Sequence, residues 1–313
     1  MVPTRRRLLQ TAGATTLAAL AGCSSASPLG SEDSTPEYTL DVESVDASPV
    51  EHALYRPGDG ALFGDPARTA LDAVLPDGRH TTYGYRPLPD DAYVARDGAY
   101  YQIKHVVTGR ERLERALVRV DTVPRDQVPE DAVLVDSLPR PSARALKILH
   151  SYTQTDGETS TADLLRGDAY VLRRPAERES RLGAGDLDGR VVTMTADGAW
   201  AYRVDVTTER LLETAHTALA VAVADSRERF RDVVFGSRID VELEADALAP
   251  ETRDVLERAI ARGSYVEQTP LSESYDALLR ALGLGAVDRL SNDNLLWYDG
   301  GLYRYALYVS EGS

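Results

Sequence analysis

The chain has 313 residues, of which 43% are hydrophobic and 27% are charged, and this composition excludes a fully disordered chain, a collagen-like fibre and a multi-span membrane protein. Its 35 basic and 50 acidic residues give a net charge of -15. This balance argues against a nucleic-acid binder, because phosphate contacts need clustered Lys and Arg. The single cysteine excludes an intrachain disulfide framework and a multi-thiolate metal site.

The basic residues are almost all arginines. Only Lys104 and Lys147 are lysines, and the sequence contains just two asparagines. An acidic, lysine-poor surface suits molar salt, where the Debye length is about 3 Å and like charges repel one another weakly. A GC-rich genome would also favour Arg over Lys. Both interpretations agree with the amino-acid composition of haloarchaeal proteins, which this sequence resembles.

The N-terminal residues carry an export pattern. Residues 4–10, which include Arg5 and Arg6, are similar to the twin-arginine export signal, and an apolar stretch rich in Ala and Leu follows. That stretch is shorter than the roughly 20 apolar residues of a spanning helix. It ends in a segment that resembles a lipobox, with the only cysteine at the modified position: Leu20, Ala21, Gly22 and Cys23. The alternative, a buried N-terminal helix with a stray cysteine, requires these features to coincide by chance.

The resemblance is to haloarchaeal lipoproteins that are exported by the twin-arginine route. It implies a signal peptide at residues 1–22, cleavage before Cys23 and a lipid on that residue, which anchors the protein to the outer face of the cell membrane. Loss of residues 1–22 changes the net charge from -15 to -18. Residues 23–37 are small and polar, and we expect them to form a flexible tether.

Internal similarity predicts three β-hairpins. Asp-Gly pairs recur between strand-like segments with spacings of 100 and 102 residues: Asp97-Gly98, Asp197-Gly198 and Asp299-Gly300. Asp-Gly suits tight hairpin turns because both residues tolerate positive φ. In the middle copy the apolar face begins one position nearer the pair, so we expect that turn to be one residue shorter.

Helices are expected before each hairpin and after the second. The first three begin at proline, a favoured first helical position, and cover residues 66–75, 141–149 and 250–260. Apolar residues at helical spacing predict the longest helix over residues 211–223, and a strand is expected over residues 38–45. Two short segments, residues 111–114 and 209–213, are also similar to each other.

These elements predict an α+β fold of three degenerate strand–helix–β-hairpin units that pack on one another, with a mainly antiparallel sheet. The expected units are residues 38–117, residues 118–235 with a C-terminal helix, and residues 236–313. Asp-Gly hairpins and proline-started helices also occur in unrelated α+β proteins. The near-constant spacing and the repeated order favour true repeats.

The sequence predicts no catalytic residue, no cofactor and no resident metal. It contains no HExxH, no G-x-S-x-G elbow and no histidine pair at ligand spacing. Asp186 and Asp188 lie in a glycine-rich loop, as weak Ca²⁺ ligands would. Because this loop lacks the other ligands of an EF-hand, a solvated turn is the preferred interpretation.

Tyrosine is the dominant aromatic residue, with 16 Tyr against three Phe and two Trp. Most of these tyrosines alternate with polar residues, which indicates half-buried strand positions. Tyr100 and Tyr308 lie opposite the inward faces of their strands. They are therefore candidates for exposed contact with a sugar or a peptide.

Two hypotheses about function follow. In the favoured one, a lipid-anchored extracytoplasmic protein of a halophilic archaeon binds a protein or wall component at the cell surface without catalysis, and its other partner is the membrane, through the lipid on Cys23. In the alternative, an extracytoplasmic enzyme, such as a hydrolase, gathers acids such as Asp186 and Asp188 in a cleft. Only the second predicts a pocket that clusters acids and histidines with shifted pKa values.

Overall fold

The computed structural model describes residues 35–58, 64–158, 164–286 and 290–310. The chain is mixed α/β with mostly antiparallel open sheets, so the prediction of a mainly antiparallel fold is confirmed at this level. One sheet has five strands and the other has eight. Within the described ranges, no helix is both long enough and apolar enough to cross a bilayer.

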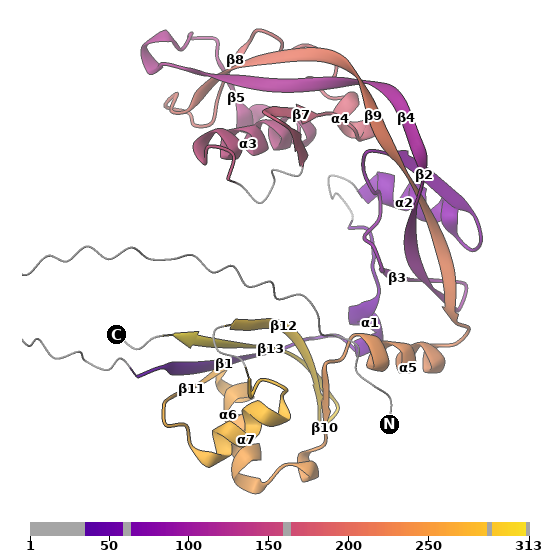
Figure 1. Ribbon diagram of the computed structural model, residues 1–313, viewed down its shortest axis with the longest axis vertical. Coiled ribbons are helices and arrows are strands. Elements are labelled where there is room, and N and C mark those ends of the chain that lie inside the picture. The colour runs from indigo at the N-terminus through magenta and orange to yellow at the C-terminus, as the bar shows by residue number, and fades with distance from the viewer. Residues whose placement is uncertain (1–34, 59–63, 159–163, 287–289, 311–313) are drawn as a thin grey trace, which may run out of the picture.

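A long antiparallel ribbon of two strands forms the spine of the eight-stranded sheet. Strand β4 (Ala99–Val123) pairs with strand β9 (Ala201–Ala224) along their whole length, and Leu113 lies opposite Leu211 near the middle. Figure 1 shows this β4–β9 ribbon bending along one side of the molecule, with smaller elements attached to each half. The segments 111–114 and 209–213, which are similar in sequence, face each other at its centre.

The helix predicted over residues 211–223 is wrong, because these residues belong to β9. Apolar residues at every fourth position lie on one face of a helix, but they also lie on one face of a strand, where the period is two. The helix of this region is α5 (Arg227–Ser237), which begins after the ribbon ends and is capped by the Ser226 side chain.

One half of the ribbon carries a small core under α2 (Gly64–Val74). Strand β2 (Arg79–Tyr83) pairs with β9, and strand β3 (Tyr93–Arg96) pairs with β4. Ala70, Ile103 and Ala218 are fully buried in this core. At the end of this half, α1 (Pro49–Ala53) and α5 pack around Phe230.

The other half of the ribbon carries a larger core under α3 (Arg140–Gln154), which includes Leu146, Tyr170 and Tyr202. Further short elements complete this lobe: η1 (Arg125–Gln127), β5 (Val133–Leu134), η2 (Val135–Ser137), β6 (Leu165–Arg166), β7 (Ala169–Val171), α4 (Pro175–Arg178) and β8 (Val191–Thr193). The strand order of the sheet is β5-β8-β9-β4-β7-β6.

The C-terminal part forms the five-stranded sheet, in the order β10-β12-β13-β1-β11. Its elements are β1 (Glu37–Ser44), β10 (Val241–Leu243), η4 (Ala245–Ala247), α6 (Pro250–Arg262), β11 (Ser264–Gln268), α7 (Glu273–Ala281), β12 (Leu290–Tyr298) and β13 (Gly301–Ser310). Helices α6 and α7 cover one face of this sheet and bury Leu40, Leu256 and Leu307. The strand predicted over residues 38–45 is confirmed as β1. The three predicted helices are present as α2, α3 and α6, but only α6 begins at its proline, since α2 begins at Gly64 and α3 begins at Arg140.

The three Asp-Gly pairs lie in turns between neighbouring strands. Asp97-Gly98 and Asp299-Gly300 each form a two-residue turn in which both residues have positive φ, as the type I′ hairpin requires. Asp197-Gly198 lies in a longer loop, residues 194–200, between the paired residues Thr193 and Ala201. The expectation of a shorter middle turn is therefore wrong, because added residues absorb the change of strand face.

Candidate functional site

A cleft of about 680 Å³ lies near the middle of the β4–β9 ribbon. It is bounded by the start of α2, most of β2, the centre of β4, and α4 with the residues on either side of it. Its charged and aromatic lining includes Asp65, His80, Tyr83, Tyr85, Arg115, Arg173, Arg178 and Glu179. We call it the arginine cleft because Arg115, Arg173 and Arg178 supply its positive charge.

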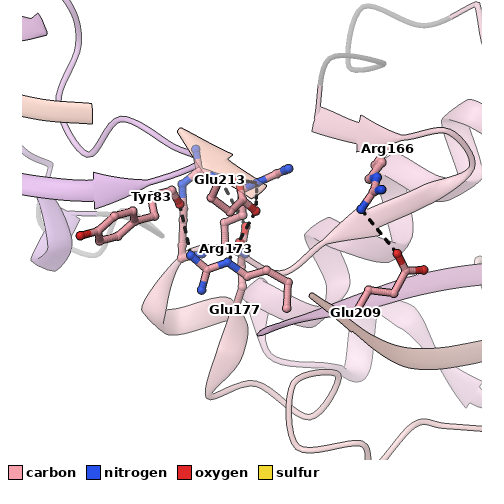
Figure 2. Close-up of polar contacts among 8 residues, drawn as sticks. Tyr83, Arg166, Arg173, Glu177, Glu209 and Glu213 are labelled. Carbon is pink, nitrogen blue, oxygen red and sulfur yellow. Dashed lines mark hydrogen bonds and ion pairs between the residues drawn. The ribbon is translucent and has the colours of Figure 1, made fainter. Parts of the chain in front are cut away.

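A buried carboxylate holds two of these arginines at the centre of the ribbon. Arg173 donates from Nε to both oxygens of Glu213, at 3.1 and 3.2 Å, and Figure 2 shows the two side chains facing each other. Arg115 Nε lies 3.6 Å from Glu213 Oε1. The side chains of Arg115 and Glu213 are only 7% and 5% exposed, so both charges are removed from water and depend on each other.

Gly84 makes room for this ion pair. Its φ is +75°, and an added Cβ would overlap the carboxylate of Glu213 and the side chain of Arg173. The Gly84 backbone N–H donates to Thr214 O at 2.9 Å, which keeps the end of β2 against β9. A residue with a side chain at this position would therefore displace the ion pair.

A second buried carboxylate, Glu177, fixes the turn that carries Arg173. The backbone N–H groups of Arg173 and Arg174 donate to one of its oxygens at 3.1 and 3.0 Å. Tyr170 OH donates to the other oxygen at 2.7 Å, and the Arg144 guanidinium lies 3.5 Å away. Burial and the charge of Glu177 raise the pKa of Tyr170 to about 12, so this hydroxyl stays a donor near neutral pH.

Positive charge accumulates in the arginine cleft. Burial lowers the pKa of Arg115, and the nearby charges of Arg178 and Arg173 lower it further, against the opposing effect of Glu213. Arg178 is exposed at the cleft and, among the described residues, its guanidinium has no ion pair or hydrogen bond. The Arg174 guanidinium lies 5.5 Å from the centre of the Tyr85 ring, which lines the same cleft.

His80 adds a neutral side chain to the wall, since burial lowers its pKa. The guanidinium groups are poor proton carriers near neutral pH, but they are strong donors to carboxylates and phosphates, and Glu213 holds two of them, Arg115 and Arg173, in place. This arrangement is therefore suited to holding an anion.

A further ion-pair cluster lies along the ribbon at the surface. Glu209 lies 3.4 Å from Arg166 and 3.5 Å from Arg119, and Arg119 also reaches Asp168 at 3.1 Å (Figure 2 shows the Arg166 contact). The Glu209 side chain is 41% exposed. Water screens this cluster, in contrast to the buried pair at Glu213.

The two tyrosines that were predicted to be exposed contact residues differ in the structure. Tyr308 is 45% exposed on β13, in one row with Leu290, Thr39 and Val266 of neighbouring strands. Tyr100 is buried, which contradicts its prediction as an exposed contact residue. Its ring stacks on Phe230, with centroids 4.3 Å apart, because α5 covers the strand face that was expected to meet solvent.

The two weak Ca²⁺ candidates lie outside the arginine cleft. Asp186 and Asp188 are exposed in the loop before β8, and Asp188 Oδ1 accepts a hydrogen bond from the backbone N–H of Val206 at 2.9 Å. In the part of the chain that the structure describes, no three His, Cys, Asp or Glu residues gather as metal ligands would. The export and lipidation residues lie outside the described residues: Arg5, Arg6, Leu20, Ala21, Gly22 and Cys23.

Sequence reasoning missed the residues of the arginine cleft. Arg115 and Glu213 lie in or beside the two segments whose similarity was visible in the sequence, and Arg173 follows the buried strand β7. The sequence signal that could have identified Arg115 and Glu213 is a charged residue at a position where apolar residues recur at every second place along a strand. The comparisons add no further candidate, because no family model, no curated protein and no solved structure matches the chain.

Proposed function

We propose that the chain is a lipid-anchored extracytoplasmic protein of a halophilic archaeon that binds a ligand at the cell surface without catalysing a reaction on it. The arginine cleft carries the binding part of this proposal, because it combines an open cavity with two guanidinium groups, Arg115 and Arg173, that the buried carboxylate of Glu213 holds in place. The export pattern and the lipobox before Cys23 support the location. The hydrolase alternative has less support, since Asp186 and Asp188 do not line this cleft.

Replacing Cys23 with serine is expected to release the protein from the membrane into the medium, because serine cannot carry a thioether-linked lipid. Fractionation of cells that express the full chain, followed by immunoblotting, measures this distribution. A paired variant with Arg5 and Arg6 both changed to lysine is expected to keep the protein inside the cell. Unchanged membrane retention of the Cys23→Ser protein would overturn the proposed anchor.

We also propose that the fold consists of three degenerate units of one design. Two sequences of strands support this: β10-β12-β13-β1-β11 and β5-β8-β9-β4-β7. In both, a short strand pairs in parallel with the first strand of a hairpin, and a strand after the main helix, β11 or β7, closes the other side. The remaining unit has the same order, with the parallel bridge between Leu54 and Tyr93, then β3, β4, β9 and β2.

In this proposal each unit contains one strand that comes from a distant part of the chain. The unit under α6 contains β1. The unit under α2 contains the second half of β9, and the unit under α3 contains the second half of β4. The expected boundary between residues 117 and 118 lies inside β4, so the units do not follow continuous segments of sequence. The β4–β9 ribbon would then consist of two strands that each run through both units.

Amide hydrogen exchange measured on two core variants tests whether each half of β4 belongs to a different unit. Leu146 lies in the core under α3 and Val74 lies in the core under α2. Leu146→Ala is expected to speed amide exchange at residues 116–120 more than at residues 101–105, and Val74→Ala is expected to do the reverse. Equal acceleration along all of β4 in both variants would contradict the proposal.

A further inference from the structure

We propose that the arginine cleft binds a small organic carboxylate, whose charged group lies against Arg115, Arg173 and Arg178 and whose apolar part lies against the rest of the lining. This inference rests on the proposed binding function and names the class of its ligand. Its basis is an imbalance of buried charge, an unpaired buried donor and the apolar part of the cleft wall.

The first observation is the charge balance. Arg173 and Arg115 share one buried carboxylate, Glu213, and Arg178 adds a third guanidinium to the same cleft. Of the two other carboxylates in the lining, Asp65 is 89% exposed and paired with Arg68, and Glu179 is exposed. Among the less exposed groups, Arg115 and Arg173 therefore exceed the single carboxylate of Glu213 by one positive charge, in a chain whose net charge is -15.

The second observation is a buried donor without an acceptor. Arg115 is 7% exposed, and its Nε has no hydrogen-bond partner among the described residues. The 3.6 Å separation from Glu213 is an ion pair but is too long for a hydrogen bond. A buried donor without an acceptor is unfavourable, so a carboxylate that approaches the Arg115 guanidinium is expected to bind there more strongly than at an exposed arginine.

The third observation concerns the rest of the wall. Apolar and aromatic side chains line it beside the arginines: Pro66, Tyr83, Tyr85, Pro87, Leu113 and Pro175. The cavity of about 680 Å³ lies within the range of small-molecule sites, roughly 300 to 1,000 Å³. A bare inorganic anion would leave these surfaces in contact with water, whereas a carboxylate with a ring or chain would cover them.

Binding of benzoate to the full-length protein tests this inference. Calorimetric titrations at a constant 3 M KCl compare benzoate with benzyl alcohol, which keeps the ring without the charge, and with inorganic phosphate, which keeps charge without the ring. We expect saturable binding of one benzoate per chain, at least about tenfold tighter than either comparison compound, since one charge-assisted hydrogen bond contributes about that factor.

Variants of two exposed arginines locate the site. Arg178 lines the cleft, whereas Arg181, three residues later and also exposed, does not. Arg178→Gln is expected to weaken benzoate binding about tenfold, and Arg181→Gln is expected to leave it unchanged, because charges in molar salt act over only about 3 Å. Equal urea midpoints of the two variants check that both are folded.

Several results would overturn the inference: no saturable benzoate binding, equal affinity for benzyl alcohol or phosphate, or equal weakening by the two arginine variants. These outcomes are separate from the test of the anchor. Benzoate binding can be measured on the Cys23→Ser protein as well, so failure of membrane anchoring leaves the cleft measurement intact. Failure of benzoate binding likewise leaves the membrane fractionation result intact.

Discussion

Replacing Glu213 with glutamine is expected to lower the free energy of unfolding by about 3 to 5 kcal/mol. The carboxylate is 5% exposed and holds Arg173 through both oxygens, while Arg115 lies 3.6 Å away. Without its charge, two guanidinium groups remain in a site that is largely removed from water. Urea unfolding at a constant 3 M KCl, followed by circular dichroism, measures the change.

Glu209 provides a matched control on the same strand. It also pairs with two arginines, Arg119 and Arg166, but its side chain is 41% exposed. Glu209→Gln is therefore expected to cost no more than about 1 kcal/mol, because exposed ion pairs are screened by water and salt. Equal losses in the two variants would show that burial does not set the strength of the Glu213 cluster.

Transfer of the protein from 3 M KCl to about 0.1 M KCl is expected to unfold it. At the lower salt concentration the Debye length grows from less than about 3 Å to about 10 Å, so the acidic side chains repel one another over a longer range. The net charge is -15, or -18 after loss of residues 1–22, so acidic side chains outnumber the basic ones that could neutralise them. Tryptophan fluorescence and circular dichroism across a dialysis series measure the transition.

Sucrose in low salt separates charge screening from general stabilisation. It favours burial of apolar surface through its exclusion from the protein, but it does not screen charge. We expect sucrose at about 0.1 M KCl to restore less folded protein than KCl does. A fully folded protein at about 0.1 M KCl without sucrose would contradict the interpretation of the acidic surface as an adaptation to salt.

Local signals in the sequence were sufficient for several elements. Proline in the first helical turn predicted α3 and α6, and the positive φ tolerated by Asp-Gly predicted the turns at residues 97–98 and 299–300. Each of these rests on the conformation of two or three neighbouring residues. The helix predicted over residues 211–223 failed because a four-residue spacing is compatible with a helix and with a strand.

The candidate site depends on contacts between distant residues and could not be predicted in the same way. Glu213 meets Arg115 because the pairing of β4 with β9 brings together residues 98 positions apart, and Arg173 comes from the segment that follows β7. The burial of Tyr100 also depends on contacts that could not be predicted from the sequence. A register shift between Tyr100 and Tyr101 and the packing of α5 place the Tyr100 ring against Phe230.

Strand β1 has a consequence for the order of events during synthesis. It is the first described strand, yet its neighbours in the sheet are β11 and β13, and its pairing with β13 extends to Ser310. At translation rates of about 5 to 20 residues per second, β1 leaves the ribosome on the order of ten to fifty seconds before its last partner is made.

During that interval β1 is an unpaired strand with apolar residues at Tyr38, Leu40 and Val42. Asp41 and Glu43 alternate with them, and such charges discourage pairing with the wrong edge. The sheet can close only after Ser310 has been synthesised. Folding of this part therefore waits for β13, and a transport route that accepts folded proteins would receive β1 already enclosed by its partners.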